Sequence, residues 1–162
     1  MLFLVFRLDN DRYAIDARAI IEILPLVRLA HVPHAPAGVA GLLNLHGQPV
    51  PVIDLALLLL GRPYRPLMST RILLVCLAPR PIDGQEIGLP ARDRPLALIA
   101  ENATDVMRRD PASFVDPGIR SENASFLGPV AQDREGPVRR IAVEGLLTPA
   151  IRSALYQDEA HP

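Results

Sequence analysis

Seventeen prolines are spread along this chain of 162 residues, and they restrict its secondary structure more than any other feature. A proline lacks the backbone N–H and fixes its own φ, so it disfavours both the interior of a helix and the centre of a sheet. The stretches between the prolines are short and apolar. The sequence therefore predicts many short strands, proline-rich connections and little helix, which is typical of an all-β barrel or sandwich.

Strands are predicted where apolar residues run on without a breaker. Residues 2–8 and 12–15 read as a hairpin about a turn at 9–11, and residues 39–55 read as two apolar strands folded about a turn at 46–49. Gly47 can supply the positive φ of that turn, and Gly41 permits a bulge or a close approach. The remaining short apolar pieces are residues 20–24, 27–32, 70–77, 96–100, 105–108, 125–132 and 138–143.

Two short helices are predicted from their end signals. Residues 55–60 can form one or two turns, because Asp54 can cap the start and Gly61 can end the helix. A second helix is expected to begin near Thr148, with Thr148 as the cap and Pro149 at the first helical position. Residues 78–94 read as an extended, mobile surface loop, and residues 110–123 read as a second loop.

Charge and hydropathy limit the classes of partner that this chain can bind. The formal net charge is -1 and the pI is near 6.4, so no basic face is indicated for nucleic acid or an anionic membrane surface. No apolar run reaches the ~18 residues that a membrane span needs. The first residues lack a basic leader, so we expect a cytoplasmic protein without direct membrane insertion. Cys76 is alone and is expected to be a small buried hydrophobe.

No catalytic or metal-binding pattern is present. His31 and His34 are spaced i, i+3, but prolines interrupt the segment and no cysteine or acidic partner has zinc-site spacing. Ser69 or Ser125 could be grouped with His46 and Asp54 only by residue type, because neither serine lies in a nucleophile elbow. The sequence therefore predicts no catalytic residue, no metal site and no cofactor. A small enzyme with loop 78–95 or 110–123 as a lid stays open as an alternative, and polar side chains converging on one cavity would support it.

Residues 39–55 closely resemble the signature of the CheW family of bacterial chemotaxis adaptors, G-[VLI]-x-N-L-R-G-x-x-[VI]-P-[VI]-[VI]-D-L. Residues 3–8 with 13–16 look like the opening of CheW-like domains, and residues 20–23 and 33–36 match V-x-E-I and the proline pair before the signature. Residues 97–101 with 104–107 resemble a further family motif. The resemblance covers roughly residues 2–156.

The resemblance implies a mainly β fold of two intertwined five-stranded SH3-like barrels, packed around a shared apolar groove, with short helices including one at the C-terminus. It implies a CheW-like domain of two barrel subdomains over residues 1–157, followed by a flexible tail at 158–162. The implied function is a non-enzymatic adaptor, without a cofactor, that joins the cytoplasmic tip of a methyl-accepting chemoreceptor to the regulatory domain of a CheA-type histidine kinase. Such a protein is cytoplasmic and recruited to membrane receptor arrays.

The resemblance also implies two sets of contact residues. Those that line or support the receptor groove are Ile20, Glu22, Gly41, Asn44, His46 and Ile99. Those that contact the kinase are Ile15, Asp16, Ala17 and Val50.

The chain departs from the family pattern at three places. His46 replaces the arginine of N-L-R-G, which weakens any ion pair with Glu22 or makes it depend on pH. The family acid after the strand at 97–100 is shifted to Glu101, and residues 140–145 diverge from the usual last strand. We therefore keep an alternative, a kinase-docking module of a non-motility pathway, such as surface sensing or cyclic-di-GMP control, with altered or lost receptor binding.

Overall fold

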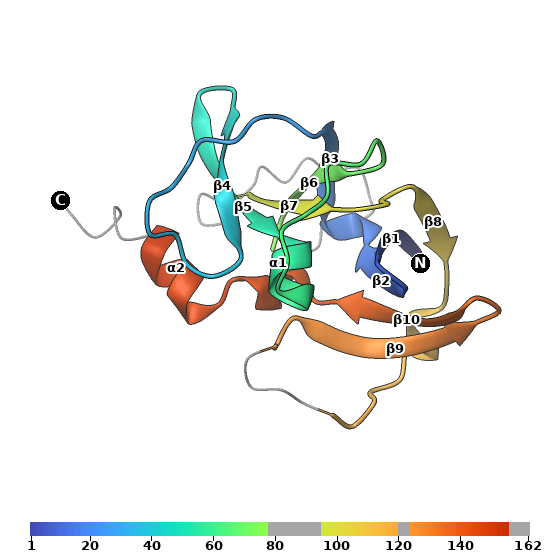
Figure 1. Cartoon of the computed structure of the whole chain (residues 1–162). Coiled ribbons are helices and arrows are strands. Elements are labelled where there is room, and N and C mark those ends of the chain that lie inside the picture. The colour runs from blue at the N-terminus through green and yellow to red at the C-terminus, as the bar shows by residue number, and fades with distance from the viewer. Residues whose placement is uncertain (78–94, 120–123, 156–162) are drawn as a thin grey trace, which may run out of the picture.

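A computed structural model describes residues 1–77, 95–119 and 124–155, and it contains two five-stranded sheets (Figure 1). The first sheet is assembled from both ends of the described chain. Its strands, in spatial order, are β8 (Asp105–Arg108), β1 (Leu2–Leu8), β2 (Asp11–Asp16), β10 (Gly136–Ile141) and β9 (Leu127–Asp133).

The second sheet is formed by the middle of the chain. Its strands, in spatial order, are β3 (Ile20–Pro25), β6 (Arg71–Val75), β7 (Leu96–Ala100), β5 (Gln48–Asp54) and β4 (Val39–Leu45). The chain thus leaves the first sheet after β2, completes the second sheet and returns at β8. This nesting, and the two five-stranded sheets themselves, confirm the intertwined β fold expected from the sequence.

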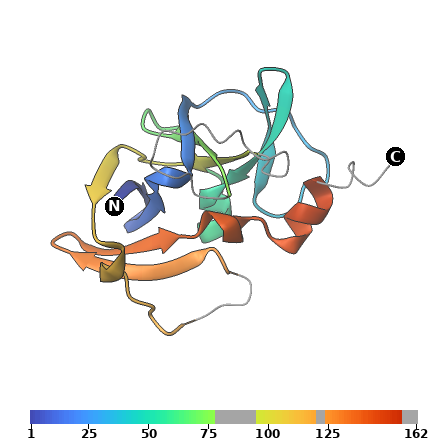
Figure 2. The ribbon, with the colours of Figure 1, turned by 180° about the vertical axis from the view of Figure 1, so that it is seen from behind.

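The two sheets share one pairing pattern. Read across each sheet, the neighbouring strands pair antiparallel, antiparallel, parallel and antiparallel, with β10 beside β2 and β5 beside β7 as the parallel pairs. The β4–β5 and β9–β10 hairpins occupy equivalent places, and the two opposite views place them at opposite sides of the molecule (Figures 1 and 2). The second sheet is therefore a structural repeat of the first.

Neither strand ladder closes on itself in the described residues. Each sheet is instead joined across its open side by one isolated bridge, Ala30 with Leu42 in the second sheet and Val115 with Val130 in the first. Each bridge is held by two backbone hydrogen bonds of 2.8–2.9 Å. Residues 27–32, expected as a further apolar piece, form this bridge instead of a strand, because prolines at 25 and 33 bound the segment and only Ala30 pairs with β4.

Alternating side chains divide the interior into three clusters. In β7, Leu96, Leu98 and Ala100 face a large core shared by both sheets, and Ala97 and Ile99 face a smaller core within the second sheet. The first sheet has its own small core around Phe3 and Phe114. Successive residues of a strand point to opposite faces, so both faces of β7 are buried and all five residues are apolar.

The helices are short. They are η1 (Ala17–Ala19), α1 (Leu55–Leu60), η2 (Pro111–Ser113), η3 (Val143–Leu146) and α2 (Pro149–Leu155).

The expected caps of α1 and α2 are present. Asp54 Oδ1 accepts from Leu57 N at 3.2 Å, Gly61 ends α1 with a φ of 74°, and Thr148 Oγ1 accepts from Ile151 N at 3.2 Å. The expected loop at 110–123 contains η2 and the bridge at Val115. The loop at 78–94 and the tail at 158–162 lie outside the described residues.

Candidate partner-binding groove

The β4–β5 hairpin carries the most distinctive motif of the sequence. Its turn is formed by His46 and Gly47, with φ values of 50° and 83°. Asn44 Oδ1 accepts a hydrogen bond of 2.8 Å from Gly47 N and so fixes the turn. Gly47 therefore supplies the predicted positive φ, and His46, a non-glycine residue, adopts the left-handed conformation as well, which is uncommon.

Figure 1 shows the segment between β3 and β4 arching over to the β4–β5 hairpin. A groove is lined by residues of this segment and of the hairpin. Its walls are mainly apolar, and its volume is about 520 Å³. The wall residues are Leu29, Ala30, Leu42, Leu43 and Pro49, and the polar rim consists of Arg28, Asn44 and Gly47.

The close approach of the two walls depends on Gly41. A Cβ added at Gly41 would lie 2.5 Å from Ala30 O and 3.1 Å from Leu29 Cβ, so glycine is needed where the arching segment meets β4. Ala30 and Leu42 exchange two backbone hydrogen bonds of 2.9 Å at the same point. A bulge also interrupts the register of β4 and β5 between Val39 and Gly41. The groove is therefore preformed by the backbone.

The structure brings some of the predicted groove residues together and separates others. Gly41, Asn44 and His46 share the β4–β5 hairpin, but only Asn44 lines the groove. Ile20 and the exposed Glu22 belong to β3, at the opposite edge of the sheet order. Ile99 is 1% exposed and packs in the small core of the second sheet, so it can support the groove but cannot contact a partner.

The predicted kinase-contact residues fall into two places. Ile15, Asp16 and Ala17 are consecutive at the end of β2, whereas Val50 lies in the second sheet. Ile15 is fully buried and Val50 is 2% exposed, so neither presents a side chain at the surface.

Asp16 is held by two arginines beside a cavity of about 240 Å³. Its carboxylate lies 2.8 Å from Arg18 Nη2 and 3.5 Å from Arg140 Nη2, and it also accepts from Arg18 N. Burial alone would favour the neutral acid, but the hydrogen bonds from Arg18 outweigh it and lower the pKa of Asp16. Within residues 16–18, the charge of Asp16 is therefore balanced by that of Arg18.

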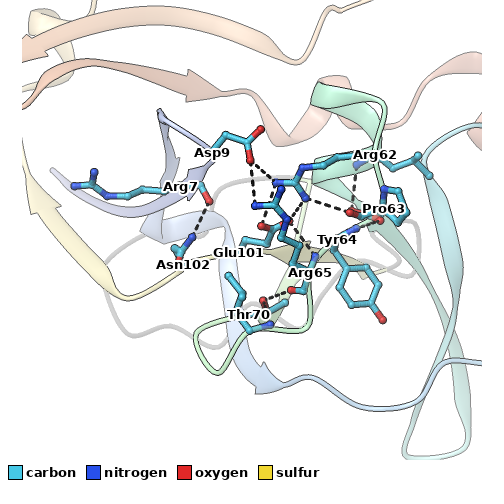
Figure 3. A network of polar contacts seen from close by, with 12 residues as sticks. Arg7, Asp9, Arg62, Pro63, Tyr64, Arg65, Thr70, Glu101 and Asn102 are labelled. Atoms are coloured by element: carbon cyan, nitrogen blue, oxygen red, sulfur yellow. Dashed lines mark hydrogen bonds and ion pairs between the residues drawn. The ribbon is translucent and has the colours of Figure 1, made fainter.

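A polar network joins the two sheets (Figure 3), and the sequence analysis did not predict it. Glu101, buried at the end of β7, accepts from both terminal nitrogens of Arg62 and from Arg65 N. Arg62 also donates to Asp9, which lies in the turn between β1 and β2. The sequence offered one signal for this network, the acidic Glu101 directly after an all-apolar strand. Its partner Arg62 could not be recognised, because it lies 39 residues away along the chain.

Clusters suited to metal binding are not seen in the part of the chain that the structure describes. Over residues 1–77, 95–119 and 124–155, no group of three or more His, Cys, Asp or Glu side chains could hold a metal ion. Cys76 is buried, and its Sγ lies 3.6 Å from Ala19 O. No helix within those ranges is long and apolar enough to cross a bilayer. A mainly apolar groove with a few polar groups at its edge is suited to bind a partner or a ligand.

Comparisons with known proteins identify the family. The CheW-like domain profile matches residues 2–150. The chain is 28% identical over 81 residues to a probable chemotaxis protein CheW of Rhizobium etli, a region that spans 50% of this chain and 52% of that protein. The crystal structure of the scaffolding protein TtCheW from Thermoanaerobacter tengcongensis superposes with a TM-score of 0.72 and 23% identity, covering 93% of this chain and 89% of that one. The match over residues 2–150 shows that this chain belongs to the CheW-like domain family.

Proposed function

We propose that this chain is a non-enzymatic signal-transduction adaptor that couples the cytoplasmic tip of a methyl-accepting chemoreceptor to the regulatory domain of a CheA-type histidine kinase. The observation that carries the proposal is the match to the CheW-like domain over residues 2–150. In this function the protein needs no cofactor and joins receptor arrays at the membrane through its partners.

The groove beside the β4–β5 hairpin is the proposed receptor site. Its apolar walls can bury aliphatic side chains of a partner, and its rim offers polar groups that fix the orientation. The bridge between Ala30 and Leu42 and the hydrogen bond from Gly47 N to Asn44 hold the walls before binding, which lowers the entropy cost of association. Glu22, Ile20 and Ile99 are assigned to the support of this site.

The kinase contact is proposed at the end of β2, around Asp16 and Ala17. The ion pairs of Asp16 with Arg18 and Arg140 give that surface a fixed shape. Ile15 and Val50 are buried, so their proposed role is to hold the backbone beneath the contact, not to touch the partner.

Calorimetric titration tests both the proposed receptor site and the proposed kinase contact. The protein is titrated with the regulatory domain of the CheA-type kinase encoded in the same genome, and separately with a soluble cytoplasmic-tip fragment of each chemoreceptor from that genome. Micromolar binding to both is the expected result for modular contacts of this size. Binding to neither would contradict the adaptor function.

The second candidate is a kinase-docking module of a non-motility pathway with altered or lost receptor binding. It is favoured by His46, which stands where the family has arginine, is exposed and makes no ion pair among the described residues. Kinase binding without binding to any receptor tip in the same titrations would select this candidate over the first.

A further inference from the structure

The charge of the groove is unbalanced. Among the described residues that line it, Arg28 is the one charged residue, and none of them is acidic. Arg28 is exposed, and it has no ion-pair partner in residues 1–77, 95–119 and 124–155. Arg12, Arg18 and Arg62, by contrast, are each paired with a described acidic side chain.

Arg28 is also well placed by the fold. It lies two residues before Ala30, whose bridge to Leu42 ties the arching segment to β4. Leu29 and Ala30 also pack closely against Gly41 of β4, which holds the same segment against the strand. The guanidinium therefore extends from a backbone that is fixed beside apolar walls, where an ionic hydrogen bond is stronger than one in open solvent.

We infer that Arg28 binds a carboxylate of the partner segment and is a specificity-determining residue of the groove. The occupant is a segment of the chemoreceptor tip that carries aliphatic side chains for the walls and an Asp or Glu for Arg28; this identification rests on the proposed function. A planar guanidinium can hold a carboxylate through two parallel hydrogen bonds, which a histidine cannot do.

Charge reversal at Arg28 tests the inference on the full chain. The probe is the receptor-tip fragment that the wild-type protein binds in calorimetric titration, measured against Arg28→Gln, Arg28→Glu and the control Arg108→Glu. Arg108 is exposed on β8 of the other sheet, so its reversal changes the net charge equally without touching the groove. We expect about tenfold weaker binding for Arg28→Gln, a larger loss for Arg28→Glu and no change for Arg108→Glu.

Two further measurements show whether the loss of binding arises in the groove and not from a change in folding or in net charge. Kinase-domain binding and the melting temperature of Arg28→Glu should equal those of the wild type. Replacing the acidic residues of the fragment by arginine, one at a time, should restore binding to Arg28→Glu at one position.

Three results would overturn the inference. Wild-type affinity in Arg28→Glu would remove Arg28 from the contact, and an equal loss in Arg108→Glu would reduce the effect to net charge. If the wild type binds no receptor-tip fragment, the receptor arm of the proposed function fails and the assigned occupant fails with it. The first two results leave the proposed function intact, so the two failures are distinguishable.

Discussion

Arg62 donates hydrogen bonds from both terminal nitrogens to the carboxylate of Glu101, at 2.8 and 3.2 Å, and Glu101 is 2% exposed. The same guanidinium donates to Asp9 at 2.9 Å. Asp9 belongs to the first sheet, whereas Arg62 follows α1 and Glu101 follows β7 of the second (Figure 3). One arginine therefore joins the two sheets at the point where the chain returns from one to the other, and acceptance by Glu101 raises the pKa of Arg62.

Loss of the Glu101 carboxylate should lower stability more than loss of the Asp9 carboxylate. Glu101→Gln removes the charge that balances Arg62 in a buried place, whereas Asp9→Asn changes a side chain that is about half exposed and screened by water. We expect the melting temperature to fall by several degrees for Glu101→Gln and by clearly less for Asp9→Asn, as measured by circular dichroism. Equal shifts would contradict the assignment of Glu101 as the buried anchor.

Acid sensitivity is expected at the β9–β10 hairpin. Asp133 accepts from both terminal nitrogens of the buried Arg12, and these hydrogen bonds lower the pKa of Asp133 below its ordinary value of 3.8. Between the lowered and the ordinary pKa, the unfolded chain binds more protons than the folded chain, so stability rises with pH there. The contribution of Asp133 is thus complete above about pH 5 and is lost as the pH falls below about 4.

Urea denaturation at pH 7 and pH 3.5 measures this contribution. Asp133→Asn should lower the free energy of unfolding at pH 7 by about 1.5–3 kcal/mol, the usual worth of hydrogen bonds to a charged group. The penalty should shrink at pH 3.5, because the unfolded chain then binds protons at Asp133 that the folded chain does not, and part of the contribution is lost. Glu144→Gln serves as the control, since Glu144 is exposed and makes no ion pair in the described ranges. A penalty that is equal at both pH values would refute the assignment.

The groove wall should be sensitive to a single methyl group. In Gly41→Ala the new Cβ would lie 2.5 Å from Ala30 O, a backbone atom that cannot move without breaking the bridge to Leu42. We expect a loss of about 1–3 kcal/mol in the free energy of unfolding and weaker receptor-tip binding. Gly47→Ala is the matched control, because nothing lies within 4 Å of its added Cβ and only the strain of a φ of 83° remains. A larger loss in Gly47→Ala would show that conformation, not contact, decides at this hairpin.

Local signals predicted the elements of this fold better than the contacts between them. Asp54, Gly61 and Thr148 were found as helix ends because a cap depends on residues three or four apart. The pairing of Glu101 with Arg62 could not be found in this way, because 39 residues separate them and no pattern in the sequence joins them. The internal repeat is hidden for a similar reason, since apolar alternation alone defines a strand and not its neighbour.

Burial explains why the site was predicted only in part. Val50 and Ile99 lie in strands of mostly apolar residues, and Ile15 lies in a strand that is buried on both faces. The sequence does not say which face of such strands is turned to a partner and which to the core. Asn44 and Gly41 could be placed because their roles depend on the hairpin turn and on a close backbone approach. Arg28 was missed because the arching segment has no regular structure, and its position beside β4 depends on one bridge.

The substitution at position 46 should set receptor preference. His46 is exposed at the tip of the β4–β5 hairpin, next to Gly47 on the rim of the groove. His46→Arg restores the residue of the family signature, with a longer reach and more hydrogen-bond donors. We therefore expect the variant to change the rank order of affinities across a panel of receptor-tip fragments, and to recover part of the binding lost in Arg28→Gln when the two changes are combined. Calorimetric titration of wild type, both single variants and the double variant measures the coupling. An unchanged rank order together with additive effects would show that positions 28 and 46 do not serve the same contact.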